Sequence, residues 1–483
     1  VLVALDRQYV DPTVDVESLA QKGLAAALQT LDPYSEIEDA NSAAEMRESV
    51  AGRYAGVGLI IAGDRFPGAG RRGASDSAIG GDGGVPSSGR DIDSVKKGTA
   101  GKAAAGKRQR QGVTVVSAFE GYAFDAGLRV GDRILAVDGK TTTGVPVDAV
   151  RDMLRGEPGT ERDAAPAAPF PGRPAAGNTF EAVLTRRLVR LRDTKLATFA
   201  GAPEDGIAYI KLSGFSQDAG RDVLAQFTSL MAQAPKGVKA LLLDLRGNPG
   251  GLLESAVDVS ALLVPKGSTI VSARGRESFG SVLYRSGQDP MLEPGMRLAV
   301  LTDGGTASAA EIVSGAVQDT DAGVIVGFGD GGTYGKGLIQ SVSELPSSKA
   351  LKFTVGRYYT PSGRRCIQSV NYNGGAKSDD LEAVGDKNKR PPPPREEGDP
   401  AFRANKVADA DRRTFRTVGG RFVRDGGGVD ADVSVKARKP SALEVALAVQ
   451  GAYFDYAGQW AKTHTFSGIE VVDAATLRDF RRF

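Results

Sequence analysis

Short apolar runs alternate with amphipathic stretches between residues 205 and 326, and this alternation restricts the fold more than any other feature of the chain. Strands that alternate with helices are typical of an α/β core built on a largely parallel sheet. The run at 240–245, Ala-Leu-Leu-Leu-Asp-Leu, is continuously apolar around one acidic residue, as expected of a buried strand. We predict strands at 207–212, 240–245, 298–302 and 324–326, and helices at 219–231, 253–263 and 308–318.

The segments before this core have other patterns. Residues 1–51 carry apolar residues at helical spacing and predict a helical N-terminal segment. Residues 52–191 combine short strands, glycine turns and one short helix, which indicates a small β-rich module. Within this module, the segments at about 64–111 and 161–177 are rich in small residues without apolar periodicity, and we expect them to be disordered insertions.

The rest of the chain is assigned to the α/β core. The core is expected to occupy 192–372, and residues 373–483 are expected to complete it. This last part holds a Pro-rich and charge-rich insertion at about 373–412, expected to be mobile, and an apolar helical pattern at 442–457. The predicted fold class is therefore α/β, or α+β for the multidomain whole.

The overall composition excludes some partners. The chain has 61 basic and 59 acidic residues, so its charge gives no reason to expect nucleic acid binding. No apolar run approaches the length of a membrane span, so we expect no integral membrane segment. The residues from Val1 onward lack a basic region followed by an apolar one, and we expect any targeting segment to be absent from this chain.

The chain has one histidine and one cysteine. His464 lies in a polar stretch near the C-terminus, and a Ser-His-Asp triad would have to use it. Cys366 cannot form a disulfide within the chain, and no histidine is close to it in sequence. A histidine-rich metal site is impossible, and we expect neither a metal nor another cofactor. Hydrolytic chemistry in this chain would need a base other than histidine.

A candidate nucleophile, Ser308, lies where a predicted buried strand meets a predicted helix, in Thr-Ala-Ser-Ala-Ala-Glu-Ile. The free backbone N–H groups at a helix N-terminus can stabilise a developing negative charge. The simpler interpretation is that Ser308 or Thr306 only caps the helix.

A candidate base, Lys336, lies between two glycines in Thr-Tyr-Gly-Lys-Gly-Leu-Ile-Gln. A neutral lysine can accept the proton of a serine hydroxyl, and burial favours the neutral form. Gln340 follows four residues later and could orient the amine. The alternative is a surface lysine in a glycine turn.

A glycine turn follows the apolar strand at 240–245, in Asp-Leu-Arg-Gly-Asn-Pro-Gly-Gly. Glycines allow the backbone to approach a reacting group closely. The N–H groups of this turn could therefore supply an oxyanion donor beside that of Ala309. The alternative is an ordinary strand-to-helix turn.

Together and in this order, the three stretches resemble the carboxyl-terminal processing peptidases, the tail-specific serine protease family. The resemblance extends to Leu-Asp-Pro-Tyr-Ser at 31–35, Gly-Val-Gly at 56–58, Arg-Tyr-Tyr-Thr-Pro-Ser-Gly at 357–363 and Gly-Gly-Gly-Val at 426–429. It implies a crotonase-like α/β catalytic core and identifies the β-rich module as an inserted PDZ domain.

The resemblance also implies a role for each site residue. Ser308 is similar to the nucleophile, Lys336 to the general base and Gln340 to the residue that orients this base. Ala309 and Gly251 correspond to the oxyanion donors, with Gly250 the next candidate. The PDZ domain would hold a substrate's C-terminal carboxylate at Gly56, Val57, Gly58 and Leu59, and Arg155 would link this binding to catalysis.

The implied partner is a protein substrate with a free C-terminal tail. The Ala-, Arg- and Gly-rich insertions suggest an algal chain that processes a photosystem subunit precursor in the thylakoid lumen, with a bacterial periplasmic enzyme as the alternative. Two other functions stay open from sequence. One is a catalytically inactive homologue that only binds tails, and the other is a crotonase-like acyl-CoA enzyme.

Overall fold

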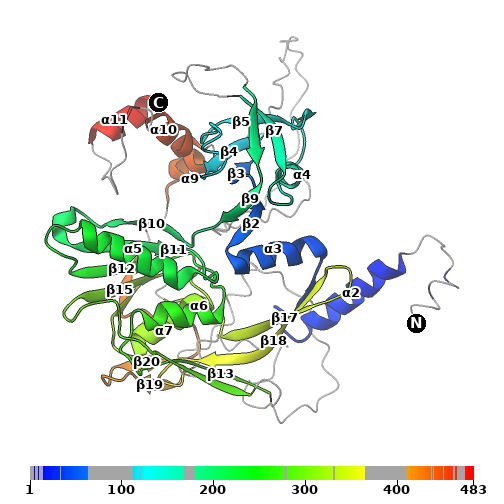
Figure 1. Cartoon of the computed structure of the whole chain (residues 1–483). Coiled ribbons are helices and arrows are strands. Elements are labelled where there is room, and N and C mark those ends of the chain that lie inside the picture. The colour runs from blue at the N-terminus through cyan, green and yellow to red at the C-terminus, as the bar shows by residue number, and fades with distance from the viewer. Residues whose placement is uncertain are drawn as a thin grey trace, which may run out of the picture. The chain divides into compact units, whose positions relative to one another are not determined.

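The computed structural model describes residues 15–63, 113–167, 180–364, 412–460 and 474–483, with short gaps inside these ranges and a few single positions elsewhere. Internal contacts divide the chain into two units (Figure 1). The core unit comprises Val1–Gly52 and Leu191–Arg438, and the β-module unit comprises Arg53–Arg190 and Lys439–Phe483. Both helices and strands contribute to each unit, which confirms the α/β multidomain prediction.

A six-stranded sheet forms the centre of the core unit. Four neighbouring pairs, from β11 through β12, β15 and β16 to β21, are parallel, and only the edge strand β10 runs antiparallel. The parallel strands agree with the strand–helix alternation of the sequence. The strands are β10 (Thr194–Phe199), β11 (Ile207–Leu212), β12 (Ala240–Asp244), β15 (Arg297–Thr302), β16 (Val324–Phe328) and β21 (Val433–Val435).

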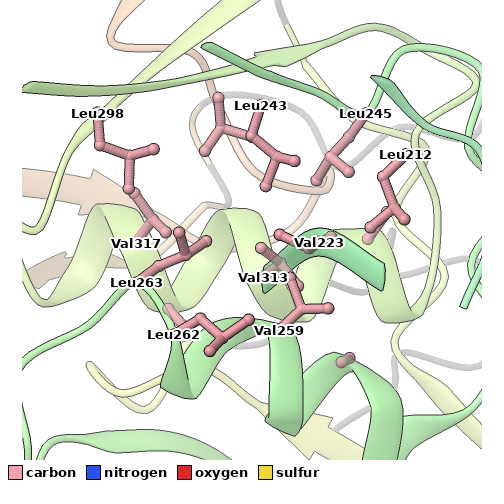
Figure 2. Close-up of a cluster of buried hydrophobic side chains, with 14 of the residues drawn as sticks. Leu212, Val223, Leu243, Leu245, Val259, Leu262, Leu263, Leu298, Val313 and Val317 are labelled. Atoms are coloured by element: carbon pink, nitrogen blue, oxygen red, sulfur yellow. The ribbon is translucent and has the colours of Figure 1, made fainter. Parts of the chain in front are cut away.

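Three helices bury apolar side chains against this sheet: α5 (Ala219–Gln233), α6 (Leu253–Ala261) and α7 (Ala309–Asp319). Figure 2 shows Leu243 from β12, and Leu245 just after this strand, facing Val313 on α7 and Val259 on α6. Burying one such side chain stabilises a fold by about 1.5–3 kcal/mol. Every residue of α7 is buried, so this helix is held on all sides by its surroundings.

A second sheet of the core unit contains β1 (Glu36–Glu38), β13 (Thr269–Gly275), β14 (Ser281–Arg285), β17 (Leu338–Glu344) and β18 (Ala350–Tyr359). The N-terminal segment contributes β1 to it, between α2 (Val16–Gln29) and α3 (Ala40–Ala51). We predicted a purely helical segment separate from the core. The strand was missed because three residues are too few to show an alternating pattern.

The β-module unit has its own sheet, in the order β3–β4–β5–β7–β8, with β6 paired to β5. β2 pairs with β9 beside it, and α4 (Val147–Leu154) contacts β3 and β5. β3 lies at an edge of the sheet, where its outer backbone groups face no strand of this sheet. The strands are β2 (Arg53–Gly56), β3 (Leu59–Ala62), β4 (Val113–Ala118), β5 (Arg133–Val137), β6 (Lys140–Thr141), β7 (Glu161–Ala167), β8 (Ala182–Thr185) and β9 (Arg187–Arg190).

The predicted insertion at 161–177 began too early. Residues 161–167 form β7, which pairs with both β5 and β8. The prediction followed the Ala- and Pro-rich composition, and pairing with two neighbours overrides that local preference. Residues 168–177 and the whole insertion predicted at 64–111 lie outside the described residues, as does nearly all of 373–412.

The C-terminal part also differs from prediction. The single helix expected at 442–457 is two, α9 (Ala442–Val449) and α10 (Ala452–Trp460), because Gly451 has a left-handed φ of 73° that ends the first helix. These helices and α11 (Ala474–Arg482) group with the β-module unit, not with the core. An apolar helix face indicates that a helix packs, but it does not identify the surface that receives it. A short hairpin of β19 (Thr414–Arg416) and β20 (Phe422–Arg424) belongs to the core unit.

None of the helices in the described ranges has the length and apolar character needed to span a membrane.

Candidate active site

Ser308 lies immediately before α7, in the connection from β15. Its φ of 55° is in the left-handed region, which L-residues other than glycine rarely adopt and which costs about 1–3 kcal/mol. The backbone N–H of Ser308 donates a hydrogen bond to Glu311 Oε2 at 2.8 Å. This bond helps to hold the strained conformation at the start of a fully buried helix.

The glycine turn after β12 contacts Ser308 directly. A Cβ atom added to Gly250 would lie 2.8 Å from Ser308 Cβ and 2.9 Å from the Ala309 nitrogen, so only glycine fits here. Asn248, which is fully buried, shapes the turn. Its side chain donates to the Leu212 carbonyl and accepts from Gly250, and its backbone carbonyl accepts from the Ala307 N–H.

These hydrogen bonds distinguish the candidate oxyanion donors. The Gly250 N–H is bound to Asn248 Oδ1 at 2.9 Å. The N–H groups of Gly251 and Ala309 have no acceptor among the residues that the structure describes. Gly251 and Ala309 therefore have N–H groups available for a ligand, whereas Gly250 supports the turn.

Lys336 lies in the connection from β16 to β17, and its backbone is fixed on both sides. Its N–H donates to Glu311 Oε2 at 2.8 Å, and its carbonyl accepts from the Tyr358 hydroxyl. Its Nζ atom lies over the ring of Tyr34, 4.4 Å from the centroid. The backbones of Ser308 and Lys336 lie close together, because both N–H groups donate to the same carboxylate oxygen.

The residue that joins them is Glu311, which was not among the predicted site residues. It is fully buried, and its other oxygen accepts from Thr333 Oγ1 at 2.6 Å and from the Gly335 N–H at 2.7 Å. Burial raises the pKa of the Glu311 carboxyl, although these hydrogen bonds oppose the rise. The available signal was an acidic residue among the apolar neighbours Ala-Ala and Ile-Val at the start of α7.

Tyr358 makes a second connection between the nucleophile and base segments. Its hydroxyl oxygen, which donates to the Lys336 carbonyl, also lies 3.1 Å from the Ser308 carbonyl oxygen and 3.4 Å from Glu311 Oε2. Only 1% of Tyr358 is exposed. The start of α7 and the Lys336 segment are therefore tied by one buried carboxylate and one buried hydroxyl.

Gln340 is the third residue of β17, and its side-chain amide donates to the Tyr34 carbonyl at 2.7 Å. We predicted that Gln340 orients the lysine amine. In the structure the Gln340 amide binds the backbone of Tyr34, and the ring of Tyr34 contacts the Lys336 amine.

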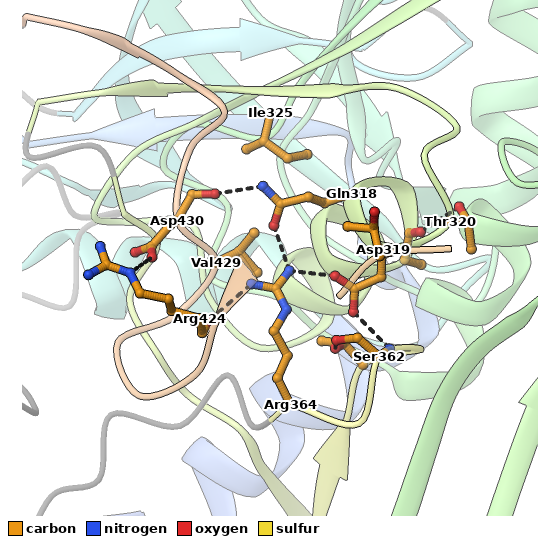
Figure 3. Close-up of polar contacts among 12 residues, drawn as sticks. Gln318, Asp319, Thr320, Ile325, Ser362, Arg364, Arg424, Val429 and Asp430 are labelled. Carbon is orange, nitrogen blue, oxygen red and sulfur yellow. Dashed lines mark hydrogen bonds and ion pairs between the residues drawn. The ribbon is translucent and has the colours of Figure 1, made fainter. Parts of the chain in front are cut away.

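The far end of α7 is fixed by a buried ion pair. Figure 3 shows the Arg364 guanidinium reaching Asp319 Oδ1, at 2.8 Å, and the Gln318 side chain. Both Arg364 and Asp319 are fully buried as an ion pair, and Asp319 also accepts from the Ser362 N–H at 3.0 Å. Removing one partner of such a pair destabilises a protein strongly, so α7 is anchored at the end opposite Ser308.

A further buried carboxylate, Asp244, stands at the base of the glycine turn. It accepts from Arg246 through both oxygens and from the Tyr209 hydroxyl at 2.6 Å. Burial opposes its ionisation, but the hydrogen bonds from Arg246 and Tyr209 prevail and lower the pKa of Asp244. Burial and the bond to Asp244 raise the pKa of Tyr209 to about 12.

The predicted tail-binding residues lie together in the β-module unit. Gly56 ends β2, Val57 and Gly58 form the turn, and Leu59 begins β3. Arg155 caps the C-terminal end of α4, and its guanidinium carbon lies 5.6 Å from the ring centroid of Tyr54. Tyr54 in turn donates its hydroxyl to the Leu59 carbonyl at 3.3 Å. Arg155 is thus connected to the predicted carboxylate loop through one aromatic residue.

The histidine has other contacts. The ring of His464 stacks on Trp460 with centroids 4.2 Å apart, and Nδ1 lies 3.1 Å from the Trp460 carbonyl. Cys366 lies outside the described residues. Across the described part of the chain, no group of three His, Cys, Asp or Glu residues could hold a metal ion.

Comparison with known proteins decides the family. Residues 206–377 match the profile of Peptidase family S41, and residues 114–163 match that of a PDZ domain. A C-terminal processing peptidase, chloroplastic, from Tetradesmus obliquus is 30% identical over 388 residues, which cover 74% of this chain and 72% of that protein. The chain belongs to the C-terminal processing peptidases of family S41. It is thus a serine-type peptidase with a PDZ domain, as the sequence motifs indicated.

Two further proteins are also similar to this chain. A carboxy-terminal-processing protease from Bartonella bacilliformis is 28% identical over 358 residues, which cover 74% of this chain and 68% of that protein. A solved structure named photosystem II D1 C-terminal processing protease is 26% identical over 76% of this chain and 88% of that chain, with a TM-score of 0.36. Family membership does not support the alternative of an acyl-CoA enzyme.

Proposed function

We propose that this peptidase cleaves protein substrates near their C-termini with Ser308 as nucleophile and Lys336 as general base. One observation carries the proposal: the backbones of Ser308 and Lys336 donate to the same oxygen of the buried Glu311. Such a shared acceptor fixes the two segments against each other before substrate binds. Positioning of this kind is a large part of catalysis, since it converts a bimolecular step into a unimolecular one.

In the proposed reaction, Ser308 Oγ attacks the carbonyl carbon of the scissile bond while neutral Lys336 Nζ accepts its proton. The N–H groups of Gly251 and Ala309 stabilise the oxyanion that forms. Lys336 then protonates the leaving amine, which yields an acyl-enzyme on Ser308. A water molecule, deprotonated by Lys336, hydrolyses the acyl-enzyme and frees Ser308.

Gln340 has an indirect role in this proposal. It holds the Tyr34 carbonyl and thereby supports the aromatic ring on which the amine of Lys336 lies. Gln340 therefore orients the base through Tyr34, and Gly250 shapes the turn that presents the Gly251 N–H.

The substrate's tail binds to the PDZ domain in this proposal. It adds as a strand to the free edge of β3, and its carboxylate binds the N–H groups of the loop at Gly56, Val57, Gly58 and Leu59. Arg155 reaches this loop through Tyr54 and couples tail binding to catalysis. The proposed partner is a protein with a free C-terminal tail, with no nucleic acid and no metal involved.

The proposed location follows the relatives. The relative from Tetradesmus obliquus is named as chloroplastic, which supports a chloroplast. Within it, the proposed location is the thylakoid lumen and the proposed substrate is a photosystem subunit precursor. The Bartonella relative is bacterial, and the proposed alternative is the bacterial periplasm.

The test uses peptides that carry candidate C-terminal tails, followed by mass spectrometry of the products. Ser308→Ala is expected to abolish cleavage, whereas Ser314→Ala, which removes a hydroxyl from the same helix, is expected to keep nearly full activity. Lys336→Arg is expected to be inactive because arginine stays protonated, with Lys266→Arg as the surface control. Cleavage by Ser308→Ala at near the wild-type rate would refute the nucleophile, and cleavage by Lys336→Arg would refute the base.

A further inference from the structure

Tyr34 is the aromatic residue that contacts the lysine amine. It lies on the N-terminal segment, just before β1, about 300 residues from Lys336 in sequence. Only 6% of Tyr34 is exposed, and it packs with Leu338 and Tyr334, which flank Lys336. Lys336 Nζ lies 4.4 Å from the centre of its ring, within the range in which an ammonium group is attracted to the face of an aromatic ring.

The backbone around Tyr34 is fixed by short hydrogen bonds. Asp32 accepts from the Tyr34 N–H and from the Ser35 hydroxyl, both at 2.8 Å. The Ser35 hydroxyl also accepts from the Thr354 N–H on β18, at 3.2 Å. The Gln340 amide on β17 holds the Tyr34 carbonyl. The turn at 32–35 is therefore fastened to both strands of the hairpin that follows Lys336.

The rest of the N-terminal segment is attached to the same hairpin. β1 pairs with β18, and Lys352 on β18 forms ion pairs with Glu36 and with Glu38, the latter at 3.0 Å. Burial opposes the charge on Lys352, but these two carboxylates outweigh it and raise its pKa. Strand pairing and the buried turn at 32–35 together fix the place of the Tyr34 ring relative to β17 and β18.

We propose that Tyr34 is a positioning residue for the general base, so that the N-terminal segment completes the catalytic site. The proposal rests on the proposed function, in which Lys336 accepts the Ser308 proton. The ring restricts the amine to one region, and it attracts the protonated form more than the neutral form. Tyr34 thus affects both the position and the proton affinity of Lys336.

The test compares Tyr34→Leu with Tyr34→Phe. Leucine keeps an apolar side chain but lacks the ring, and phenylalanine keeps the ring but lacks the hydroxyl. For each variant, the pH profile of kcat/KM is measured and divided by the fraction of sites that a fluorophosphonate labels, which corrects for misfolded protein.

Tyr34→Leu is expected to lower kcat roughly tenfold and to move the acid limb of the profile to lower pH by about 0.4–1.5 units, because the protonated amine loses its attraction to the ring. Tyr34→Phe is expected to keep the acid limb of the wild type. An acid limb in Tyr34→Leu that coincides with the wild type would overturn the proposal, since a purely structural role changes amplitude and not the limb.

A second measurement separates this proposal from the dyad itself. In the Ser308→Ala protein, the pH dependence of Lys336 acetylation by acetic anhydride is followed by mass spectrometry, with and without Tyr34→Leu. A shift to lower pH of the same size supports the contact even if Ser308 is not the nucleophile. An unchanged acetylation profile overturns the Tyr34 proposal even if Ser308 and Lys336 both prove essential.

Discussion

Glu311→Gln tests the connection between the nucleophile and base segments. The carboxylate accepts four hydrogen bonds at 2.6–2.8 Å, two through each oxygen. A glutamine amide has one acceptor oxygen, so one pair of donors would face an NH2 group. The Thr333 hydroxyl can turn to accept from the amide, and this orientation leaves the Gly335 N–H without its acceptor.

The structure therefore predicts the loss of one or two charge-assisted bonds, each worth about 1.5–3 kcal/mol, with partial relief because a charge is no longer buried. We expect a net loss of about 2–4 kcal/mol in the free energy of unfolding. The displaced backbone should also lower kcat by about a hundredfold with little change in KM, since a misplacement of about 1 Å has an effect of that order.

The assay is thermal unfolding together with steady-state cleavage of a tail peptide. Glu204→Gln, at an exposed position of the core unit, is the matched control and should resemble the wild type. The pH dependence gives a further check. Because burial raises the pKa of Glu311 above its ordinary value of 4.5, the folded protein binds the proton more tightly than the unfolded chain. The wild type should therefore gain stability relative to Glu311→Gln as pH falls toward 4.5. Full kcat and an unchanged unfolding temperature in Glu311→Gln would refute the reasoning.

Three other outcomes are expected. Asp244→Asn should destabilise the protein by about 1–3 kcal/mol at pH 7, since it breaks the bidentate contact with Arg246. The stability difference between variant and wild type should shrink in acid, because Asp244 of the wild type becomes protonated as pH falls through its lowered pKa. A stability difference that is equal at all pH values in thermal unfolding would contradict this. His464→Ala should leave cleavage within a small factor, because the ring stacks on Trp460, and a loss of several orders of magnitude without unfolding would revive a histidine mechanism. A tail peptide with a C-terminal amide should have a specificity constant about ten- to a hundredfold below that of the free acid, and equal constants would exclude carboxylate recognition by the PDZ domain.

The central sheet was predictable because its pattern is repeated. Each of the four predicted strands overlaps an observed one, and the helices α5, α6 and α7 begin within one residue of the prediction. Buried parallel strands and amphipathic helices carry strong periodicity over many residues. β1 and β7 carry no such signal, because one is three residues long and the other has the composition of a linker.

The candidate site was predictable where chemistry requires a particular residue type. Three features stood out in the sequence: a serine where a strand meets a helix, a lysine between two glycines, and a glycine turn after a buried strand. They are Ser308, Lys336 and the turn after β12. Glu311, Tyr358 and Tyr34 did not stand out, because their role depends on contacts between segments far apart in the chain. No local pattern reveals that a buried glutamate accepts from a loop 25 residues away.

Capture of the acyl-enzyme tests the central claim most directly. The full chain is mixed with a tail peptide, quenched in acid within milliseconds to seconds, digested and mapped by mass spectrometry. A Ser–Lys mechanism predicts that the N-terminal part of the peptide becomes attached to Ser308, and that the adduct does not form in Lys336→Arg. An adduct on any other residue, or an undiminished adduct on Ser308 in Lys336→Arg, would contradict the assignment of Ser308 and Lys336 as nucleophile and base.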